Sequence, residues 1–124
     1  MIAHFDWLPL QGSVVEATEA LILKHNPKWR GSGGNGVYPF WFSDLASAGF
    51  VALESLTFDL DQPYTHEAWR GRIRASAGVA ASLDADAVAR FDSEHALLLQ
   101  EQFPQDLLRA PHRIFALIGR KVGA

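Results

Sequence analysis

The sequence predicts an α/β fold built from about three strands and four to five helices. Short apolar segments, typical of strands, stand near the start, in the middle and at the end of the chain. Longer segments between them carry helix-start residues and apolar residues at helical spacing. The chain has 124 residues, of which 48% are hydrophobic, and this is enough for one core. We therefore expect a single domain over residues 1–124.

The first elements are indicated by local signals. Residues 1–8 form a mostly apolar segment that proline and glycine close, which predicts a strand. Ser13 and Glu16 have the spacing of a capping box, which predicts a helix over residues 13–25. Residues 28–36 are polar and rich in glycine, so we expect a loop there.

The later elements carry similar signals. Alternating apolar residues over 50–60 predict a strand that is covered on one face. Residues 114–118 are apolar throughout, so we expect a buried final strand over residues 112–121. The remaining helices are expected where a start or stop residue marks an end of the segment: 39–48, 65–75 and 82–103.

The connections predict how the strands run. A long helical segment joins the first two strands, so these two strands should be parallel. Three strands make a small sheet, and we expect one of its edges to be unpaired or occupied by something absent from this chain.

The composition excludes several classes of function. The net charge of −3 argues against a non-specific nucleic-acid binder, which needs a basic surface. The absence of cysteine excludes disulfides, thiolate metal sites and cysteine nucleophiles. The histidines lack the spacing of a zinc site, so we expect no metal. No apolar run has the length of a membrane span and no signal peptide is recognisable, so we expect a cytoplasmic protein.

The glycine-rich loop matches a nucleotide-binding pattern only in part. Residues 31–36 fit G-x-G-x-x-G literally. The dinucleotide-binding motif also requires an apolar strand that runs directly into the glycines. Here a helix end and a polar segment come before them, so we favour a surface loop, with a lid over a pocket as its candidate role.

Two places along the chain are candidates for small-molecule binding. Asp6 and Trp7 stand where the first strand ends, and ligands of open α/β sheets bind at such ends. The alternative, equally weighted, is that Trp7 belongs to the core and Asp6 to a solvated turn. Aromatic residues flank the glycine-rich loop, and Trp41 is the first candidate among them to line a pocket.

A short helix rich in arginine is a third candidate. Arg70 and Arg74 are four residues apart and share a face beside Trp69, so two guanidinium groups could bind a carboxylate or phosphate. A solvated face, or salt bridges to Glu67 and other acids, is the favoured alternative. His66 is a speculative acid–base candidate, for which a role at the helix start or on the surface is favoured.

The resemblance of this chain to a known family rests on four segments: HFDWLPLQGSVVEATEALILKHNPKW (4–29), GVYPFWFSDLASAGF (36–50), PYTHEAWRGRIRASAGV (63–79) and PHRIFALIGRK (111–121). Together they resemble the C-terminal half of class I S-adenosylmethionine-dependent methyltransferases, and more narrowly the small-molecule group called methyltransferase type 11 or UbiE-like.

The resemblance implies a truncated Rossmann-like fold and a function. In the family the sheet is mostly parallel, helices cover both faces, and the last strand is antiparallel. Residues 50–60 and 112–121 would be the last two strands, and the helices over 65–103 an insertion that helps to cover the substrate. The candidate substrate-binding residues would then lie on the methyl-acceptor side, and His66 would be the speculative base: Asp6, Trp7, Trp41, Trp69, Arg70 and Arg74.

The cofactor implied by the resemblance is S-adenosylmethionine. The family holds it with a glycine-rich loop after its first strand and an acid at the end of its second, and this chain matches neither. No cofactor-binding residue is therefore assigned. We expect that the isolated chain does not methylate and is a truncated product, one half of a split enzyme, or a fragment.

The open sheet edge supports an alternative from another class. In this second hypothesis the chain is a non-catalytic α/β module that homodimerises or docks on a partner through that edge. The two hypotheses are compatible, because part of an enzyme can also be a dimer.

Overall fold

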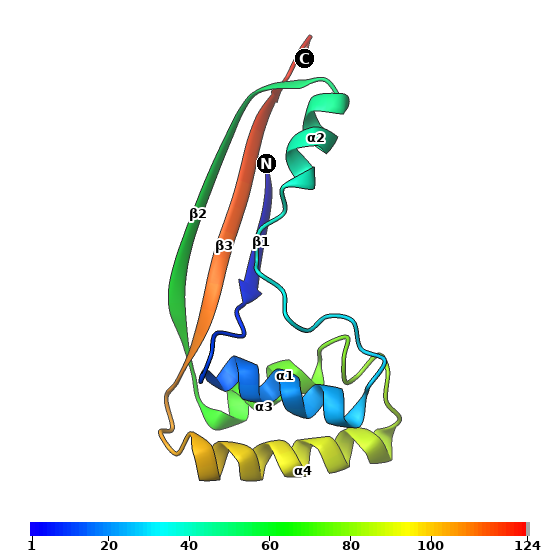
Figure 1. Ribbon diagram of the computed structural model, residues 1–124, viewed down its shortest axis with the longest axis vertical. Coiled ribbons are helices and arrows are strands. Elements are labelled where there is room, and N and C mark those ends of the chain that lie inside the picture. Colours follow the sequence, from blue (N-terminus) through cyan, green and yellow to red (C-terminus); the bar gives the residue numbers. More distant parts are fainter. Residues whose placement is uncertain (124) are drawn as a thin grey trace.

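The computed structural model describes residues 1–123. It is an α/β fold with one open three-stranded sheet and four helices (Figure 1). The elements follow the order expected from the sequence: β1 (Ile2–Trp7), α1 (Val14–His25), α2 (Phe40–Ser47), β2 (Phe50–Tyr64), α3 (His66–Arg74), α4 (Ala85–Gln102) and β3 (Leu108–Lys121).

The last strand lies in the centre of the sheet. The strand order is β1-β3-β2, and β3 is antiparallel to both neighbours. His112 of β3 shows this arrangement, because it pairs with Trp7 of β1 and with Leu60 of β2. The expected antiparallel pairing of the last two strands is therefore confirmed. β1 and β2 run in the same direction, as predicted, but they are not neighbours because β3 lies between them.

Three boundaries differ from the prediction, and each has a physical reason. β2 continues to Tyr64 because β3 begins already at Leu108, and the two residues pair with each other. Residues 61–64, predicted as a turn, are thus strand. α4 begins after Asp84, whose carboxylate accepts the Ala87 N–H at 2.8 Å. Ser82 was the predicted cap, but its hydroxyl instead donates to a carbonyl in the preceding turn.

The helix signals near the start of the chain act as predicted. The Ser13 hydroxyl accepts the Glu16 N–H at 3.1 Å, and the Glu16 carboxylate accepts the Gly12 N–H at 3.0 Å. This arrangement is a variant of the capping box, in which the Glu16 carboxylate binds the N–H of the residue before the cap and not that of the cap itself. Gly49 follows α2 with a φ of 86°, the left-handed conformation predicted there.

The molecule consists of a helical base and a sheet arm. Helices α1, α3 and α4 pack together at one end of the sheet, where the carboxyl ends of β1 and β2 arrive (Figure 1). The base holds most of the core, whose largest buried side chains include Trp69 and Phe91. The rest of the sheet extends away from the base, and α2 packs on β2 and β3 of this arm. Among residues 1–123, none of the helices combines the length and the apolar composition of a membrane-spanning segment.

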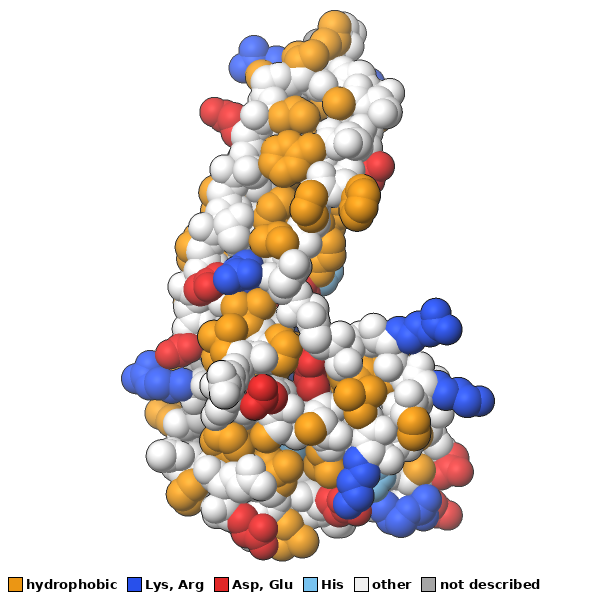
Figure 2. All heavy atoms as spheres, in the orientation of Figure 1, with side chains coloured by type: hydrophobic (Ala, Val, Ile, Leu, Met, Phe, Trp, Pro, Cys, Tyr) orange, Lys and Arg blue, Asp and Glu red, His pale blue; other side chains and the backbone are white. Residues whose placement is uncertain are grey.

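One face of the sheet arm keeps apolar side chains exposed. Phe5 and Phe58 both pair with Ile114 and therefore share its face, and they are 42% and 49% exposed. Leu56, on the same face, is 47% exposed. The prediction that the apolar face of β2 is covered is therefore wrong, because α2 packs near Phe115, on the opposite face. Figure 2 shows hydrophobic side chains at the surface along much of the arm.

Candidate functional site

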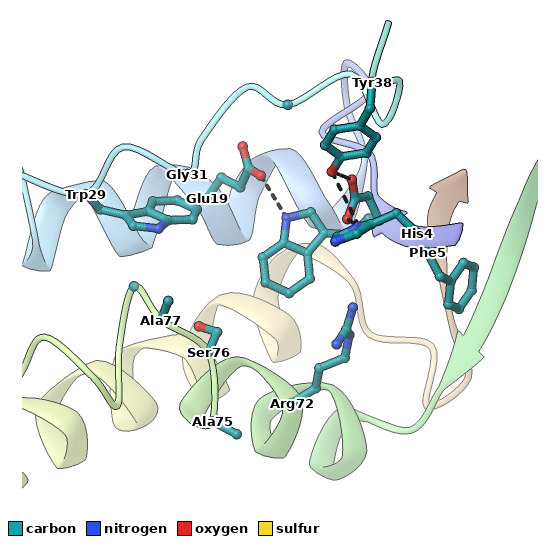
Figure 3. Close-up of a pocket in the computed structure, with 14 residues that line it drawn as sticks. His4, Phe5, Glu19, Trp29, Gly31, Tyr38, Arg72, Ala75, Ser76 and Ala77 are labelled. Atoms are coloured by element: carbon teal, nitrogen blue, oxygen red, sulfur yellow. Dashed lines mark hydrogen bonds and ion pairs between the residues drawn. The ribbon is translucent and has the colours of Figure 1, made fainter. Parts of the chain in front are cut away.

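The main cavity lies where the sheet arm meets the helical base. Its volume is about 670 Å³, within the usual range for small-molecule sites. The end of β1 forms one wall, the loop between α1 and α2 a second, and the end of α3 with the following turn a third (Figure 3). Asp6 and Trp7, predicted from their place at the strand end, both line it.

Trp7 is fixed from several sides. Its indole N–H donates to Glu19 at 2.9 Å, and its ring meets the edge of Trp69 at 5.8 Å. The Arg72 guanidinium lies over the Trp7 ring at 4.9 Å from the centroid. Trp7 is thus half-buried against the core and also lines the cavity, so the two interpretations of this residue hold together.

Glu19 connects the glycine-rich loop to the core. Glu19 is only 5% exposed. One oxygen of its carboxylate accepts the Trp7 N–H, and the other accepts the Gly33 N–H at 2.9 Å. Gly33 has a φ of 74°, a conformation that favours glycine. The cavity is lined by Gly31 and Gly34 of the same loop. The predicted surface loop is therefore a wall of the cavity, anchored by a carboxylate.

Sequence reasoning missed Glu19, although a signal was present. Val15 and Ile22 stand four residues before and three residues after it, and both are buried. An acid on the buried face of an amphipathic helix needs a partner, and such a position indicates a structural or functional contact.

A polar cluster occupies the other side of β1. The Asp6 carboxylate accepts the Tyr38 O–H and lies within hydrogen-bond reach of His4 Nδ1 (Figure 3). The pKa of Tyr38 is raised to about 12, mainly by burial and further by the hydrogen bond to Asp6 and its charge. Tyr38 therefore keeps its proton at neutral pH and acts as a donor to Asp6. Trp41 stacks on Tyr38 at 4.4 Å and supports the cavity wall from behind without lining it.

Arg72 is the charged residue of α3 that reaches the cavity. No residue among 1–123 forms an ion pair with it, and its Nε is buried without a hydrogen-bond partner. This Nε is closed to solvent and therefore to a ligand, so the donors that a ligand could use are the terminal Nη groups of Arg72. The sequence analysis singled out its neighbours, Arg70 and Arg74, as the candidate pair.

Arg70 and Arg74 share a face as predicted, but that face contacts α4. Both bind the carboxylate of Asp92, Arg70 through two donors and Arg74 through one at 2.8 Å. The hydrogen bond from Arg70 is the largest effect that holds the pKa of Asp92 below its usual range. The bond from Arg74 acts in the same direction, and burial opposes both. The two arginines therefore form salt bridges, which was the favoured alternative to ligand binding. Their partner is Asp92 and not Glu67.

The other predicted residues of α3 also lie outside the cavity. Trp69 is fully buried and donates its indole N–H to Thr18 at 3.0 Å. His66 Nε2 lies 2.8 Å from the carbonyls of both Phe103 and Gln105, just after α4. His66 therefore contacts the end of α4, and Trp69 supports Trp7 from the core side.

Comparisons with protein-family models, with curated proteins and with solved structures found no match to this chain.

Proposed function

We propose that the chain forms the acceptor-binding part of an S-adenosylmethionine-dependent small-molecule methyltransferase. The observation that carries the proposal is the cavity at the carboxyl end of β1, where open α/β sheets bind ligands. Aromatic walls and a few polar groups converge there, as in small-molecule sites generally.

The direction of the strands supports the proposal. The family that this sequence resembles has a mostly parallel sheet with an antiparallel last strand. Here β1 and β2 run in the same direction, and β3, the last strand, runs opposite to both.

The uncovered parts of the sheet arm give a second line of support. Within residues 1–123 the outer edge of β1 has no strand partner, and Ile2–Phe5 are exposed. The apolar face with Phe5, Leu56 and Phe58 is also uncovered. The family covers both faces with helices and continues the sheet with its cofactor-binding half. We infer that this half pairs with β1 and covers that face, whether it belongs to the same polypeptide or to another.

The described residues do not fit S-adenosylmethionine itself. The glycine-rich loop follows α1, not a strand, and the Gly33 N–H is already bound by Glu19. The cofactor supplies an activated methyl group, so the protein's task is to align the acceptor with it. In this chain, Trp7 and Tyr38 would hold the acceptor, and the loop over residues 28–36 would exclude water from it.

The proposal predicts separate sites for acceptor and cofactor. In calorimetric titration, the chain of residues 1–124 should show no saturable binding of S-adenosylmethionine at micromolar concentrations. The chain together with its cofactor-binding half, supplied by the same polypeptide or by a second one, should bind it and transfer the methyl group to a small-molecule acceptor. In that assembled enzyme, Trp7→Ala should raise the KM for the acceptor about 10-fold or more and leave the Kd for the cofactor unchanged.

Two results would contradict this assignment. Micromolar binding of S-adenosylmethionine to residues 1–124 would show that the chain carries its own cofactor site. Failure of the assembled enzyme to transfer a methyl group to any of a broad acceptor panel would exclude the activity.

The exposed edge of β1 favours a second candidate function, a non-catalytic module that homodimerises through this edge. An exposed strand edge readily pairs with another strand. Light scattering at several concentrations should then detect a dimer, and Phe5→Lys should shift it to monomer. A clean monomer at high concentration would exclude this candidate.

A further inference from the structure

We propose that the cavity binds a flat organic carboxylate, and that Arg72 is the residue that recognises the carboxylate group. This inference rests on the proposed function, because the bound anion would be the methyl acceptor held in the same cavity. Four features of the structure carry it: the direction of Arg72, its free donors, the pairing of the other charged groups, and the aromatic walls.

Helix geometry directs Arg72 toward the cavity. Arg70 and Arg74 point to α4 and bind Asp92 there. Arg72 stands about 200° around the helix from Arg70, since each residue turns the chain by about 100°. Its side chain therefore leaves the opposite side of α3 and extends toward Trp7 and the end of β1 (Figure 3).

The contacts of Arg72 leave its hydrogen-bond donors free. A guanidinium that stacks on an aromatic ring uses its face, while its N–H groups point outward in the plane. Arg72 lies over the Trp7 ring, and its terminal Nη groups form no ion pair in the described part of the chain. A carboxylate accepts two parallel N–H bonds from such a guanidinium edge.

The acids that line the cavity are already occupied. Asp6 is bound by Tyr38 and His4, and Glu19 accepts N–H groups from Trp7 and Gly33. Neither carboxylate is paired with Arg72, which forms no ion pair within residues 1–123. An anionic ligand would supply the carboxylate that this guanidinium lacks.

The walls next to Arg72 indicate a flat apolar body. Trp7, Trp29 and Tyr38 contribute aromatic rings to the cavity. Trp29 packs tightly over Gly78, where an added Cβ would lie 3.0 Å from the indole and 2.9 Å from Ile22. Planar ligands stack well on such rings. An aromatic carboxylate could bind Arg72 through its charged group and stack on these aromatic side chains through its ring.

The test uses benzoate as the probe, with NMR titration of the 124-residue chain. Benzoate should saturate and shift the indole N–H of Trp7 and the amides of Gly31 and Gly34. Benzamide, which has the same shape without the charge, should bind about 10-fold or more weakly, because a hydrogen bond to a charged group is lost. Acetate, which has the charge without the ring, should also bind more weakly than benzoate.

Variants of α3 assign the effect to Arg72. Arg72→Gln should remove the preference for benzoate over benzamide, whereas Arg72→Lys should keep part of it. Arg74→Gln is the matched control, since it removes the same charge from the same helix but faces Asp92; it should retain the preference. Circular dichroism checks that each variant is folded, and the comparison of the three probes on the wild-type chain needs no variant.

The outcomes separate this inference from the proposed function. Equal binding of benzoate and benzamide, or an unchanged preference in folded Arg72→Gln, would overturn the carboxylate site. If acetate bound as tightly as benzoate, the inference that the ligand has a flat aromatic part would be wrong. These titrations contain no cofactor, so they can detect the carboxylate site even if methyl transfer is absent. Conversely, methyl transfer to a neutral acceptor would support the proposed function and contradict the carboxylate site.

Discussion

Replacement of Trp69 by alanine is expected to lower the free energy of unfolding by about 3–5 kcal/mol. The indole is fully buried between α1, α3 and the sheet, and it donates its N–H to Thr18 at 3.0 Å. It also contacts the rings of Trp7 at 5.8 Å and Tyr64 at 5.1 Å. Alanine would leave a large cavity among groups that cannot all collapse into it, and it would remove the donor of a buried hydrogen bond.

Two further variants test this explanation by chemical denaturation. Trp69→Phe keeps the aromatic packing but loses the N–H, so the loss should be smaller, about 1–2 kcal/mol. Trp41→Ala is the control on the arm, where the ring is only partly buried against Tyr38, and it should cost less than Trp69→Ala. If Trp69→Ala retained wild-type stability but lost ligand binding, Trp69 would be a substrate residue and not a core residue.

Local patterns predicted much of the fold. Ser13 and Glu16 define the start of α1, because a cap involves residues that are neighbours along the chain. The apolar run at residues 114–118 predicted a buried strand, and β3 is the central strand of the sheet. The order of strands and helices was also predictable, because each element carries its own periodicity.

Pairings between distant segments could not be predicted in the same way. The extension of β2 to Tyr64 depends on its partner Leu108, and no local signal at either residue specifies the other. Arg70 and Arg74 were predicted to share a face, but their acid, Asp92, lies 22 and 18 residues away on α4. The side of α3 that meets the cavity is set by this packing, and it places Arg72 there.

Acidification of the solution from pH 7 to pH 4 is expected to lower the free energy of unfolding by about 3 kcal/mol through His95. Burial lowers the pKa of His95 from 6.5 to about 4. The charge of Asp92 opposes this shift, whereas the charges of Arg70, Arg74 and His66 add to it. Below pH 6.5 the unfolded chain therefore takes up a proton that the folded chain still excludes, so stability falls as the pH falls.

The surroundings of His95 explain why the folded protein favours the neutral ring. Trp69 donates to the Thr18 hydroxyl, which lies 3.1 Å from His95 Nε2 and can donate to it. A protonated Nε2 could not accept this bond, and Nδ1 has no partner within residues 1–123. His112, whose pKa burial also lowers, adds a loss of the same sign.

Urea denaturation of the wild type and of His95→Gln between pH 7 and pH 5 separates the contribution of His95 from that of His112. About 2 kcal/mol of the loss through His95 should occur in this range, above the ordinary pKa of 3.8 for the paired carboxyl of Asp92. His95→Gln should reduce the dependence on pH to the part that His112 contributes, because glutamine can accept from Thr18 but does not titrate. Thr18→Val should instead lower stability at pH 7 and keep most of the slope, since burial is the largest cause of the lowered pKa of His95. Equal slopes in the wild type and His95→Gln would show that the acid sensitivity arises elsewhere.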